Sequence, residues 1–223
     1  MNKYLYYSSI ILSVFIILCF LVSPKMEANP SESQLYVYDY NLFLIINESH
    51  YSSYLNQFMI WMTLYGKEMF WLVTIILMFT LGGWIGKKVA VIMVICMIVL
   101  IPIGFLTKDI VKRQRPLIPK EDFILQIDAE YAFPSGHAMI VSANAAVALA
   151  LFRITRKQRI ITMILALEAA LVCISRIYVG GHYPSDVVGG VLLGVGIFFI
   201  IISLQNNLET KIMIPMKKNI QRK

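Results

Sequence analysis

The sequence predicts an all-α integral-membrane protein, built as a bundle of six transmembrane helices. Of its 223 residues, 58% are hydrophobic and only 15% are charged, and the mean hydropathy is +0.70. Such values lie outside the range of soluble globular proteins and are typical of membrane proteins. No internal repeat, low-complexity tract or second domain is visible in the sequence, so we expect a single domain over residues 1–223.

Six apolar stretches supply the predicted helices. Several are shorter than the ~20 residues that a bilayer-spanning helix needs, but flanking Tyr, Ser and Gly residues can extend each of them. The stretches are residues 8–22, 70–86, 89–106, 138–152, 160–174 and 187–204.

The first stretch, with Lys3 before it, is also compatible with a secretory signal peptide. Residues 24–27 make a poor cleavage site because small residues are missing there, so we expect a retained first helix. Either interpretation places the chain from residue 24 onward on the outer side of the membrane.

Residues 27–67 are too polar to span the bilayer. We expect an interfacial amphipathic element here, between the first two helices and on the outer leaflet. A folded loop that covers the bundle would explain the segment equally well. The aromatic and apolar residues that favour the interfacial element include Tyr36, Tyr38, Tyr40, Phe43 and Leu44.

Helix packing explains several features of the last three stretches. The Ala-rich stretch 138–152 and the glycines Gly190, Gly194 and Gly196 offer small side chains that let helices approach closely. Glu168 lies near the middle of the fifth stretch, where a buried acid is costly and usually paired or functional. We interpret it as an interhelical hydrogen-bonding group, with a proton relay as the alternative.

Basic residues outside the motifs indicate the orientation. They fall on one side of a six-helix bundle, which the positive-inside rule makes cytoplasmic. We therefore expect both termini in the cytoplasm, and loops 107–137 and 175–186 outside the cell membrane. The net charge of +7 then reflects topology and contact with anionic lipid rather than nucleic-acid binding. These residues are Lys3, Lys87 and Lys88, Arg153, Arg156, Lys157 and Arg159, and Lys211, Lys217, Lys218, Arg222 and Lys223.

Two of the three histidines lie in runs suited to phosphoryl transfer. In the later run, Ser175-Arg176 is followed after five residues by His182 and after three more by Asp186. A carboxylate can orient one ring nitrogen of a histidine so that the other faces a substrate as base or nucleophile. Arg176 offers a planar fork of donors that suits phosphate oxygens.

The other histidine ends the run Pro134-Ser135-Gly136-His137, directly before the Ala-rich stretch. Ser135 is a good helix N-cap, Gly136 lets the backbone approach a ligand, and the N–H groups of a helix N-terminus attract anions. Upstream, Lys108 is followed after six residues by Arg115-Pro116. The three segments together offer the cations, donors and histidines that a bound phosphate and its transition state require.

The pattern K-x6-RP, PSGH and SR-x5-H-x3-D resembles that of the type 2 phosphatidic acid phosphatases, a superfamily shared with vanadium haloperoxidases. All three motifs are complete and in order over residues 108–186, and Asp39 to Gly66 resembles, more weakly, the segment that often precedes the second transmembrane helix. The resemblance implies that His182 is the nucleophile and forms a phosphohistidine, that Asp186 orients it, and that His137 protonates the leaving group. It implies phosphate binding by Lys108, Arg115, Ser135, Gly136 and Arg176.

Other charged and polar residues have simpler interpretations. Lys112, Arg113 and Lys120 are expected to form a solvated membrane flank, and His50, outside any motif, to be a polar residue without a catalytic role. Asp186 can also cap the helix that begins near residue 187, since acidic groups favour helix N-termini. Capping and orienting His182 are compatible.

No sequence signature for a metal or cofactor is present. The cysteines are too scattered for a metal site and are expected to be small buried hydrophobic residues. The charge of a phosphate must therefore be balanced by Arg and Lys, so we predict a metal-independent enzyme. The cysteines are Cys19, Cys96 and Cys173.

The implied substrate keeps its tail in lipid while its phosphate reaches the outer surface. The resemblance offers polyprenyl diphosphates, phosphatidylglycerophosphate, phosphatidic acid and lipid A phosphates. The short chain and small loops favour undecaprenyl diphosphate, hydrolysed to the monophosphate to recycle a lipid carrier for cell-wall or glycan assembly. A phosphotransferase with the same phosphohistidine, a haloperoxidase and a non-enzymatic lipid-binding or transport protein are the alternatives. Six membrane helices argue against a haloperoxidase, and a binding protein leaves the motif histidines unexplained.

Overall fold

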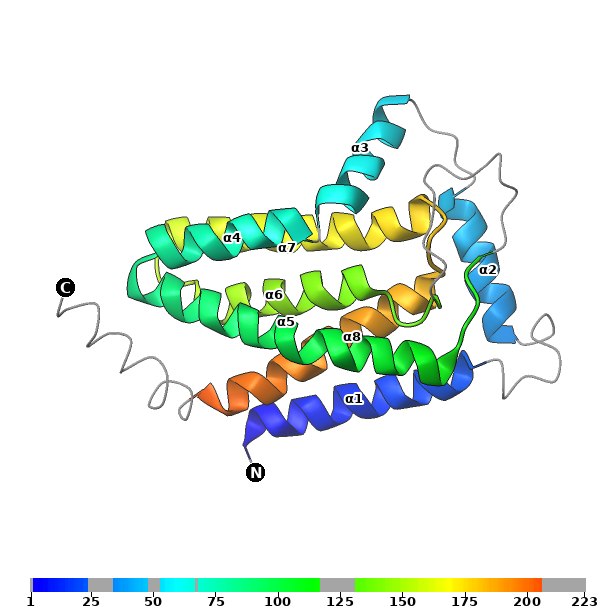
Figure 1. The fold of residues 1–223 in the computed structure, drawn as a ribbon, viewed down its shortest axis with the longest axis horizontal. Coiled ribbons are helices and arrows are strands. Elements are labelled where there is room, and N and C mark those ends of the chain that lie inside the picture. Colours follow the sequence, from blue (N-terminus) through cyan, green and yellow to red (C-terminus); the bar gives the residue numbers. More distant parts are fainter. Residues whose placement is uncertain (1, 24–33, 48–52, 67, 117–130, 206–223) are drawn as a thin grey trace.

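The computed structural model describes residues 2–23, 34–47, 53–66, 68–116 and 131–205, and these residues form helices and no strands. Figure 1 shows α1 and α4 to α8 side by side along the long axis, with α2 across one end of the bundle and α3 projecting from it. The all-α prediction is confirmed for these residues. The helices are α1 (Lys3–Leu21), α2 (Gln34–Asn47), α3 (Ser53–Tyr65), α4 (Glu68–Leu81), α5 (Gly83–Val111), α6 (Gly136–Leu151), α7 (Arg156–Tyr178) and α8 (Pro184–Ser203).

Each of the six apolar stretches contains a helix, but six membrane spans are not confirmed. Within the described residues, four helices are long and apolar enough to cross a membrane, namely α1, α5, α7 and α8. A fifth span exists if α3 and α4, which are bent by 59° at their junction, count as one broken span. The 16 residues of α6 cover about 24 Å at ~1.5 Å per residue, which is less than the ~30 Å hydrocarbon core.

The apolar stretches 70–86 and 89–106 predict a tight turn at Lys87 and Lys88 between them, but the turn between α4 and α5 lies elsewhere. Lys87 and Lys88 lie inside α5, and the chain turns instead at Gly82 and Gly83. Gly83 has φ +62°, a left-handed conformation that glycine adopts without strain. A Cβ atom on Gly82 would lie 2.5 Å from the carbonyl oxygen of Met78, so the turn is tight enough to exclude a side chain.

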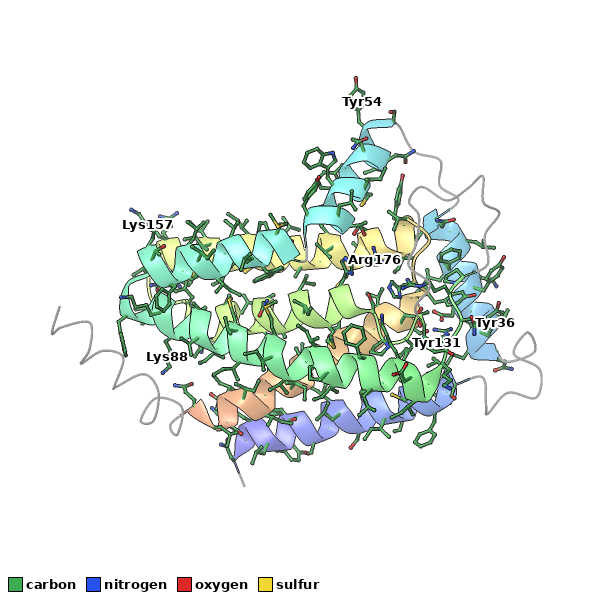
Figure 2. All side chains as sticks on the ribbon, viewed as in Figure 1. Tyr36, Tyr54, Lys88, Tyr131, Lys157 and Arg176 are labelled. Atoms are coloured by element: carbon green, nitrogen blue, oxygen red, sulfur yellow. The ribbon has the colours of Figure 1, made fainter. Side chains whose placement is uncertain are left out.

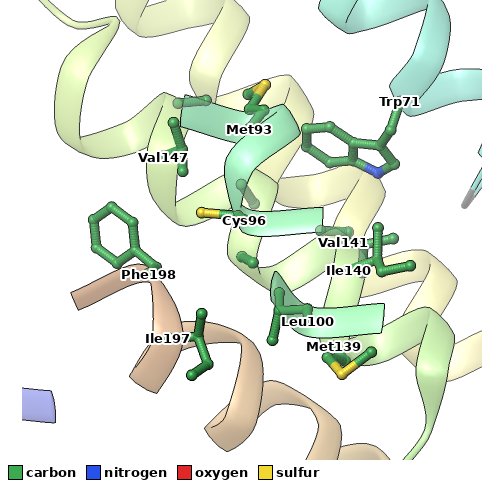
Figure 3. Packing of buried hydrophobic residues seen from close by; sticks show 14 of the residues in the cluster. Trp71, Met93, Cys96, Leu100, Met139, Ile140, Val141, Val147, Ile197 and Phe198 are labelled. Atoms are coloured by element: carbon green, nitrogen blue, oxygen red, sulfur yellow. The ribbon is translucent and has the colours of Figure 1, made fainter. Parts of the chain in front are cut away.

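The hydrophobic core surrounds α6, which packs against α5, α7 and α8. Figure 3 shows Trp71 of α4, Leu100 of α5, Val141 of α6 and Phe198 of α8 converging in this core. Because α6 is covered on several sides, its alanines are needed to keep its neighbours close. A short, buried α6 carries the second motif at its N-terminal end.

Glycines on α8 allow close packing on two sides, as the sequence predicts. A Cβ atom on Gly194 would lie 2.3 Å from the carbonyl oxygen of Met139 in α6, and one on Gly196 would lie 2.5 Å from Leu12 in α1. Gly190 similarly faces α6, at the carbonyl oxygen of Ser135. These contacts fix the start of α6 relative to α8, and both helix starts carry motif residues.

Lys88 and Lys157, two of the basic residues that predict the orientation, lie towards the opposite end of the bundle from Arg176 of the third motif (Figure 2). In Figure 2, Lys88 and Lys157 lie at one end, whereas Arg176 lies towards the other, where Tyr36 and Tyr131 are also found. The basic residues of the C-terminal tail lie outside the described residues. The described part of the bundle is therefore polarised along its long axis.

The α2 helix covers the end of the bundle that carries the motifs. Phe43 is fully buried, and its ring packs at 5.7 Å between centroids from that of Tyr183. On its outer side Tyr38 is 74% exposed and Ile45 is 70% exposed. One face of α2 therefore covers the bundle, as one of the two interpretations expects, and the other face presents apolar side chains outward.

Candidate active site

The three motifs meet at one end of the bundle because each lies at a helix terminus there. Lys108 is in the last turn of α5, and Arg176 is in the last turn of α7. Ser135 is the N-cap of α6, and Asp186 is in the first turn of α8. Residues far apart in the sequence are therefore brought together by helix packing.

A tight turn after α7 places His182. Gly180 has φ +84°, and the N–H groups of Gly181 and His182 both donate to the carbonyl oxygen of Arg176, at 3.1 and 3.2 Å. A Cβ atom on Gly181 would lie 3.1 Å from Nη2 of Arg176. The two glycines thus let the chain fold back until His182 and Arg176 share one site.

His182 is buried and surrounded by cations. Its side chain is 2% exposed, and Nη1 of Arg115 lies 3.4 Å from its Nε2. A guanidinium group can only donate, so Nε2 is the unprotonated nitrogen and its lone pair accepts from Arg115. Burial, followed by the charges of Arg176, Arg115 and Lys108, holds the pKa of His182 well below its usual value. The imidazole is therefore neutral at neutral pH, the form that a nucleophile requires.

Asp186 caps α8 and also faces His182. Its Oδ2 accepts from the backbone N–H of Tyr183 at 2.8 Å, so the capping prediction is confirmed. The same Oδ2 lies 3.7 Å from Nδ1 of His182, which is beyond hydrogen-bonding distance but close enough for an electrostatic contact. Nδ1 of His182 has no hydrogen-bond partner among the described residues, so the orienting role of Asp186 stays a prediction.

Arg113 corrects one prediction. It is 6% exposed rather than part of a solvated flank, and its guanidinium lies 2.6 Å from both Asp39 and Asp186. Asp39 is not among the predicted site residues, although a lone acid four positions before Phe43, on the buried face of α2, is a usable signal. Lys112 is exposed as predicted, and Lys120 and His50 lie outside the described residues.

Thr63 of α3 contacts two of the predicted site residues. Its carbonyl oxygen lies 3.1 Å from Nε2 of His137, and because a carbonyl only accepts, that nitrogen carries a proton. Its Oγ1 accepts from Nη1 of Arg176 at 3.0 Å and lies 3.1 Å from Oγ of Ser175. No sequence signal distinguishes Thr63, since its partners follow 74 to 113 residues later.

Ser135 occupies the predicted N-cap, but its hydroxyl makes no capping hydrogen bond. The residue is fully buried, and its Oγ has no hydrogen-bond partner among the described residues. Its backbone N–H donates to the carbonyl oxygen of Asp186 at 3.0 Å, which joins the starts of α6 and α8. Nothing lies within 4 Å of where a Cβ atom of Gly136 would be, so the backbone is open to a ligand there.

Charge in the site comes from Lys and Arg. Within the described ranges, no group of three or more His, Cys, Asp or Glu side chains is placed to hold a metal ion. Glu168 is buried in α7, where a Cβ atom on Gly66 would lie 3.1 Å from its Oε1, and its hydrogen-bonding role stays a prediction. The arrangement offers the neutral imidazole of His182, a second imidazole whose Nε2 bears a proton, and three cations, a set suited to phosphoryl transfer.

Comparisons with known proteins support this chemistry. A family model described as PAP2 superfamily matches residues 71–209. The chain is 30% identical over 208 residues to an undecaprenyl-diphosphatase of Sulfolobus acidocaldarius, a match that covers 92% of this chain and 94% of that protein. It is 34% identical over 101 residues to phosphatidylglycerophosphatase B of Bacillus subtilis, covering 42% of this chain and 47% of that one.

A crystal structure shares the fold. The transmembrane PAP2-type phosphatidylglycerolphosphate phosphatase from Bacillus subtilis superposes with a TM-score of 0.67 at 22% identity, covering 91% of this chain and 98% of that one. Asp39 and Thr63 both precede the segment matched by the family model, residues 71–209. Part of the site is therefore supplied by helices outside that segment.

Proposed function

The chain belongs to the PAP2 superfamily of membrane lipid phosphatases, and on that premise we propose that it hydrolyses undecaprenyl diphosphate, or a similar polyprenyl diphosphate, to the monophosphate. The choice of substrate is carried by the similarity to the Sulfolobus undecaprenyl-diphosphatase, which extends over 92% of this chain. The chemistry is carried by the position of His182, with Arg115 at its Nε2 and Asp186 at its Nδ1.

In the first step, Nε2 of His182 attacks the terminal phosphorus in line. The P–N bond forms while the bond between phosphorus and the bridging oxygen breaks, and His137, as the imidazolium, gives a proton to the departing oxygen. Arg115, Arg176 and Lys108 balance the charge on the equatorial oxygens, and the buried hydroxyl of Ser135 donates to one of them. Asp186 stabilises the charge that develops on the His182 ring.

In the second step, water hydrolyses the phosphohistidine. His137, now a neutral imidazole, takes a proton from the attacking water, and the P–N bond breaks to release inorganic phosphate. Both histidines then return to their starting states, so protons balance over the cycle. No redox change or cofactor is needed.

The site is proposed to face the outer side of the cell membrane. Lys88 and Lys157 lie at the end of the bundle opposite Arg176 (Figure 2), and the positive-inside rule assigns a Lys- and Arg-rich end to the cytoplasm. Both termini would then be cytoplasmic. The apolar outer face of α2 would lie in the outer leaflet beside the site, where the lipid tail of the substrate enters.

Phosphate release from two lipids tests the proposal. The protein, purified in detergent and treated with EDTA, is given undecaprenyl diphosphate or phosphatidylglycerophosphate at equal concentration, with a folded His182→Ala variant as control. We expect EDTA-resistant release, faster from undecaprenyl diphosphate, and none from the variant. Release that requires added metal would contradict the charge balance proposed for the site.

Phosphatidylglycerophosphate is the second candidate substrate, since the chain also resembles phosphatidylglycerophosphatase B. A higher kcat/KM for this lipid would favour it. Release from neither lipid by a folded protein would point to phosphate transfer to another acceptor, which adding acceptor lipids or sugars would reveal.

A further inference from the structure

We infer that Arg113 and Asp39 are positioning residues for the reaction: Arg113 fixes Asp186 behind the nucleophile, and Asp39 fixes Arg113. Asp39, Arg113, Ser185 and Asp186 are called the ion cluster below. The inference rests on the proposed function, because it takes His182 as the nucleophile. Neither Arg113 nor Asp39 has a place in the mechanism so far.

The ion cluster has a defined geometry. Nη1 of Arg113 lies 2.6 Å from Oδ1 of Asp186, and Nη2 lies 2.6 Å from Oδ2 of Asp39. Nη1 also donates to Oγ of Ser185 at 2.6 Å. Asp39 accepts from the backbone N–H of Ser185 at 2.9 Å and contacts the Ser185 hydroxyl. One planar guanidinium thus bridges two carboxylates, a geometry that lysine cannot reproduce.

The ion cluster is buried and joins three parts of the chain. The side chains of Arg113, Asp39 and Asp186 are 7%, 4% and 0% exposed. The guanidinium also lies 4.4 Å from the ring centroid of Tyr183, at the N-cap of α8. Burying such charges costs several kcal/mol per ion, and hydrophobic residues of similar size often stabilise as well or better. Stability alone therefore explains the ion cluster poorly.

The link to His182 runs through the two oxygens of Asp186. Arg113 occupies Oδ1, whereas Oδ2 accepts from the Tyr183 N–H and lies 3.7 Å from Nδ1 of His182. Arg113 therefore sets which oxygen faces the imidazole. It also offsets part of the negative charge that the imidazole experiences.

The charges around His182 fix the sign of this effect. Arg176 from α7, Arg115 from the loop after α5 and Lys108 from α5 disfavour the imidazolium. An ionised Asp186, 3.7 Å from Nδ1, acts in the opposite direction. Removing the cation at position 113 would leave Asp186 more negative in effect and raise the pKa of His182. Removing the carboxylate at position 39 would leave Asp186 as the remaining carboxylate partner of Arg113. The positive charge of Arg113 would then offset more of the charge of Asp186, which would lower the pKa of His182.

The experiment is a titration of the histidines by NMR. The chain contains only three histidines, so protein labelled with ¹⁵N-histidine in detergent gives few ring signals, and His182→Gln assigns that of His182. The variants are Arg113→Gln and Asp39→Asn, and Lys112→Gln is the control because it removes a charge from an exposed neighbour. Phosphate release is measured on the same samples.

We expect Arg113→Gln to raise the pKa of His182 by about one unit, the lower end of the range for a nearby charge. Asp39→Asn should lower it, and Lys112→Gln should leave it unchanged. We expect kcat of Arg113→Gln to fall about 10- to 100-fold with little change in KM, as when a partner behind an active-site ligand is lost.

Unchanged pKa values in both cluster variants would overturn the inference, and so would shifts of the same sign in both. A kcat loss in Arg113→Gln that Lys112→Gln shares would also overturn it. If Arg113→Gln does not fold, Asp39→Asn still tests the inference. It removes a buried charge of the other sign, and a pKa of His182 that does not fall in this variant would overturn the inference. If the wild type releases no phosphate from either lipid, the proposed substrate fails while the titration still tests the ion cluster.

Discussion

Nε2 of His137 lies 3.1 Å from the carbonyl oxygen of Thr63, so α3 holds the histidine of the second motif from outside the matched family segment. The hydroxyl of Thr63 also accepts from Arg176 of the third motif at 3.0 Å. Thr63 therefore contacts both His137, the proposed acid, and Arg176, a proposed phosphate-binding residue. The contact with Arg176 can be tested by itself, because a substitution at position 63 can remove the hydroxyl while the backbone carbonyl that contacts His137 remains.

Thr63→Val should raise KM about tenfold, because Arg176 loses a hydrogen bond of the strength found for charged donors. Thr63→Ser keeps the hydroxyl and should behave like the wild type. Steady-state phosphate release by the two variants checks this prediction. Equal KM values for Val and Ser would show that the hydroxyl does not position Arg176.

Arg115→Lys should lower kcat/KM about 10²- to 10³-fold, since a lysine lacks the fork that serves both the Gly181 carbonyl and the bound phosphate. The matched control is Arg156→Lys, at the exposed start of α7, which should leave kcat/KM unchanged. Equal effects of the two substitutions would contradict the phosphate-binding role of Arg115.

The pH dependence of kcat/KM should place the acidic limb below 6.5, the usual value for histidine. Burial and the charges of Arg176, Arg115 and Lys108 lower the pKa of His182, so the neutral nucleophile persists as the pH falls below that value. Lys108→Met removes a cation that disfavours the imidazolium and should shift the limb upward. Phosphate release between about pH 5 and 8 checks both statements. A wild-type limb above 6.5 would contradict them.

Gly194→Ala should lower the melting temperature of the detergent-purified protein. Its Cβ atom would lie 2.3 Å from the carbonyl oxygen of Met139, and such overpacking costs about 1–3 kcal/mol. Gly136→Ala is the matched control for stability, because nothing lies within 4 Å of its Cβ position. Equal melting temperatures of the two variants would show that close α6–α8 packing at Gly194 is not required for stability.

The sequence predicts the helices and the clustering of the motif residues well, because both depend on local features of the chain. Each apolar stretch is continuous, and the spacing of the glycines in α8 indicates that they lie where helices pack closely. The motifs cluster because each borders an apolar stretch, so helix termini at one end of the bundle bring them together. Lys108, Arg176 and Asp186 lie at such termini.

The sequence does not indicate which residues far apart in the chain contact each other. Among Lys112, Arg113 and Arg115, nothing local marks Arg113 as the buried cation, because Asp39 and Asp186 lie 74 and 73 residues away. The position of the α4–α5 turn, by contrast, can be predicted from the sequence, since Gly82-Gly83 is a stronger turn signal than Lys87-Lys88. The burial of α6 depends on the packing of α5, α7 and α8 around it, which hydropathy does not report.

Trapping the phosphorylated enzyme tests the role of His182 most directly. In a His137→Ala variant, the first step still proceeds with a diphosphate, whose monophosphate leaving group needs little help from an acid, while the second step lacks its base. After rapid quenching of a reaction with undecaprenyl diphosphate labelled on its terminal phosphate, the mechanism predicts an alkali-stable, acid-labile label on the peptide that contains His182. Phosphate release at the wild-type rate with no label, or a label on another residue, would contradict the assignment of His182 as the nucleophile.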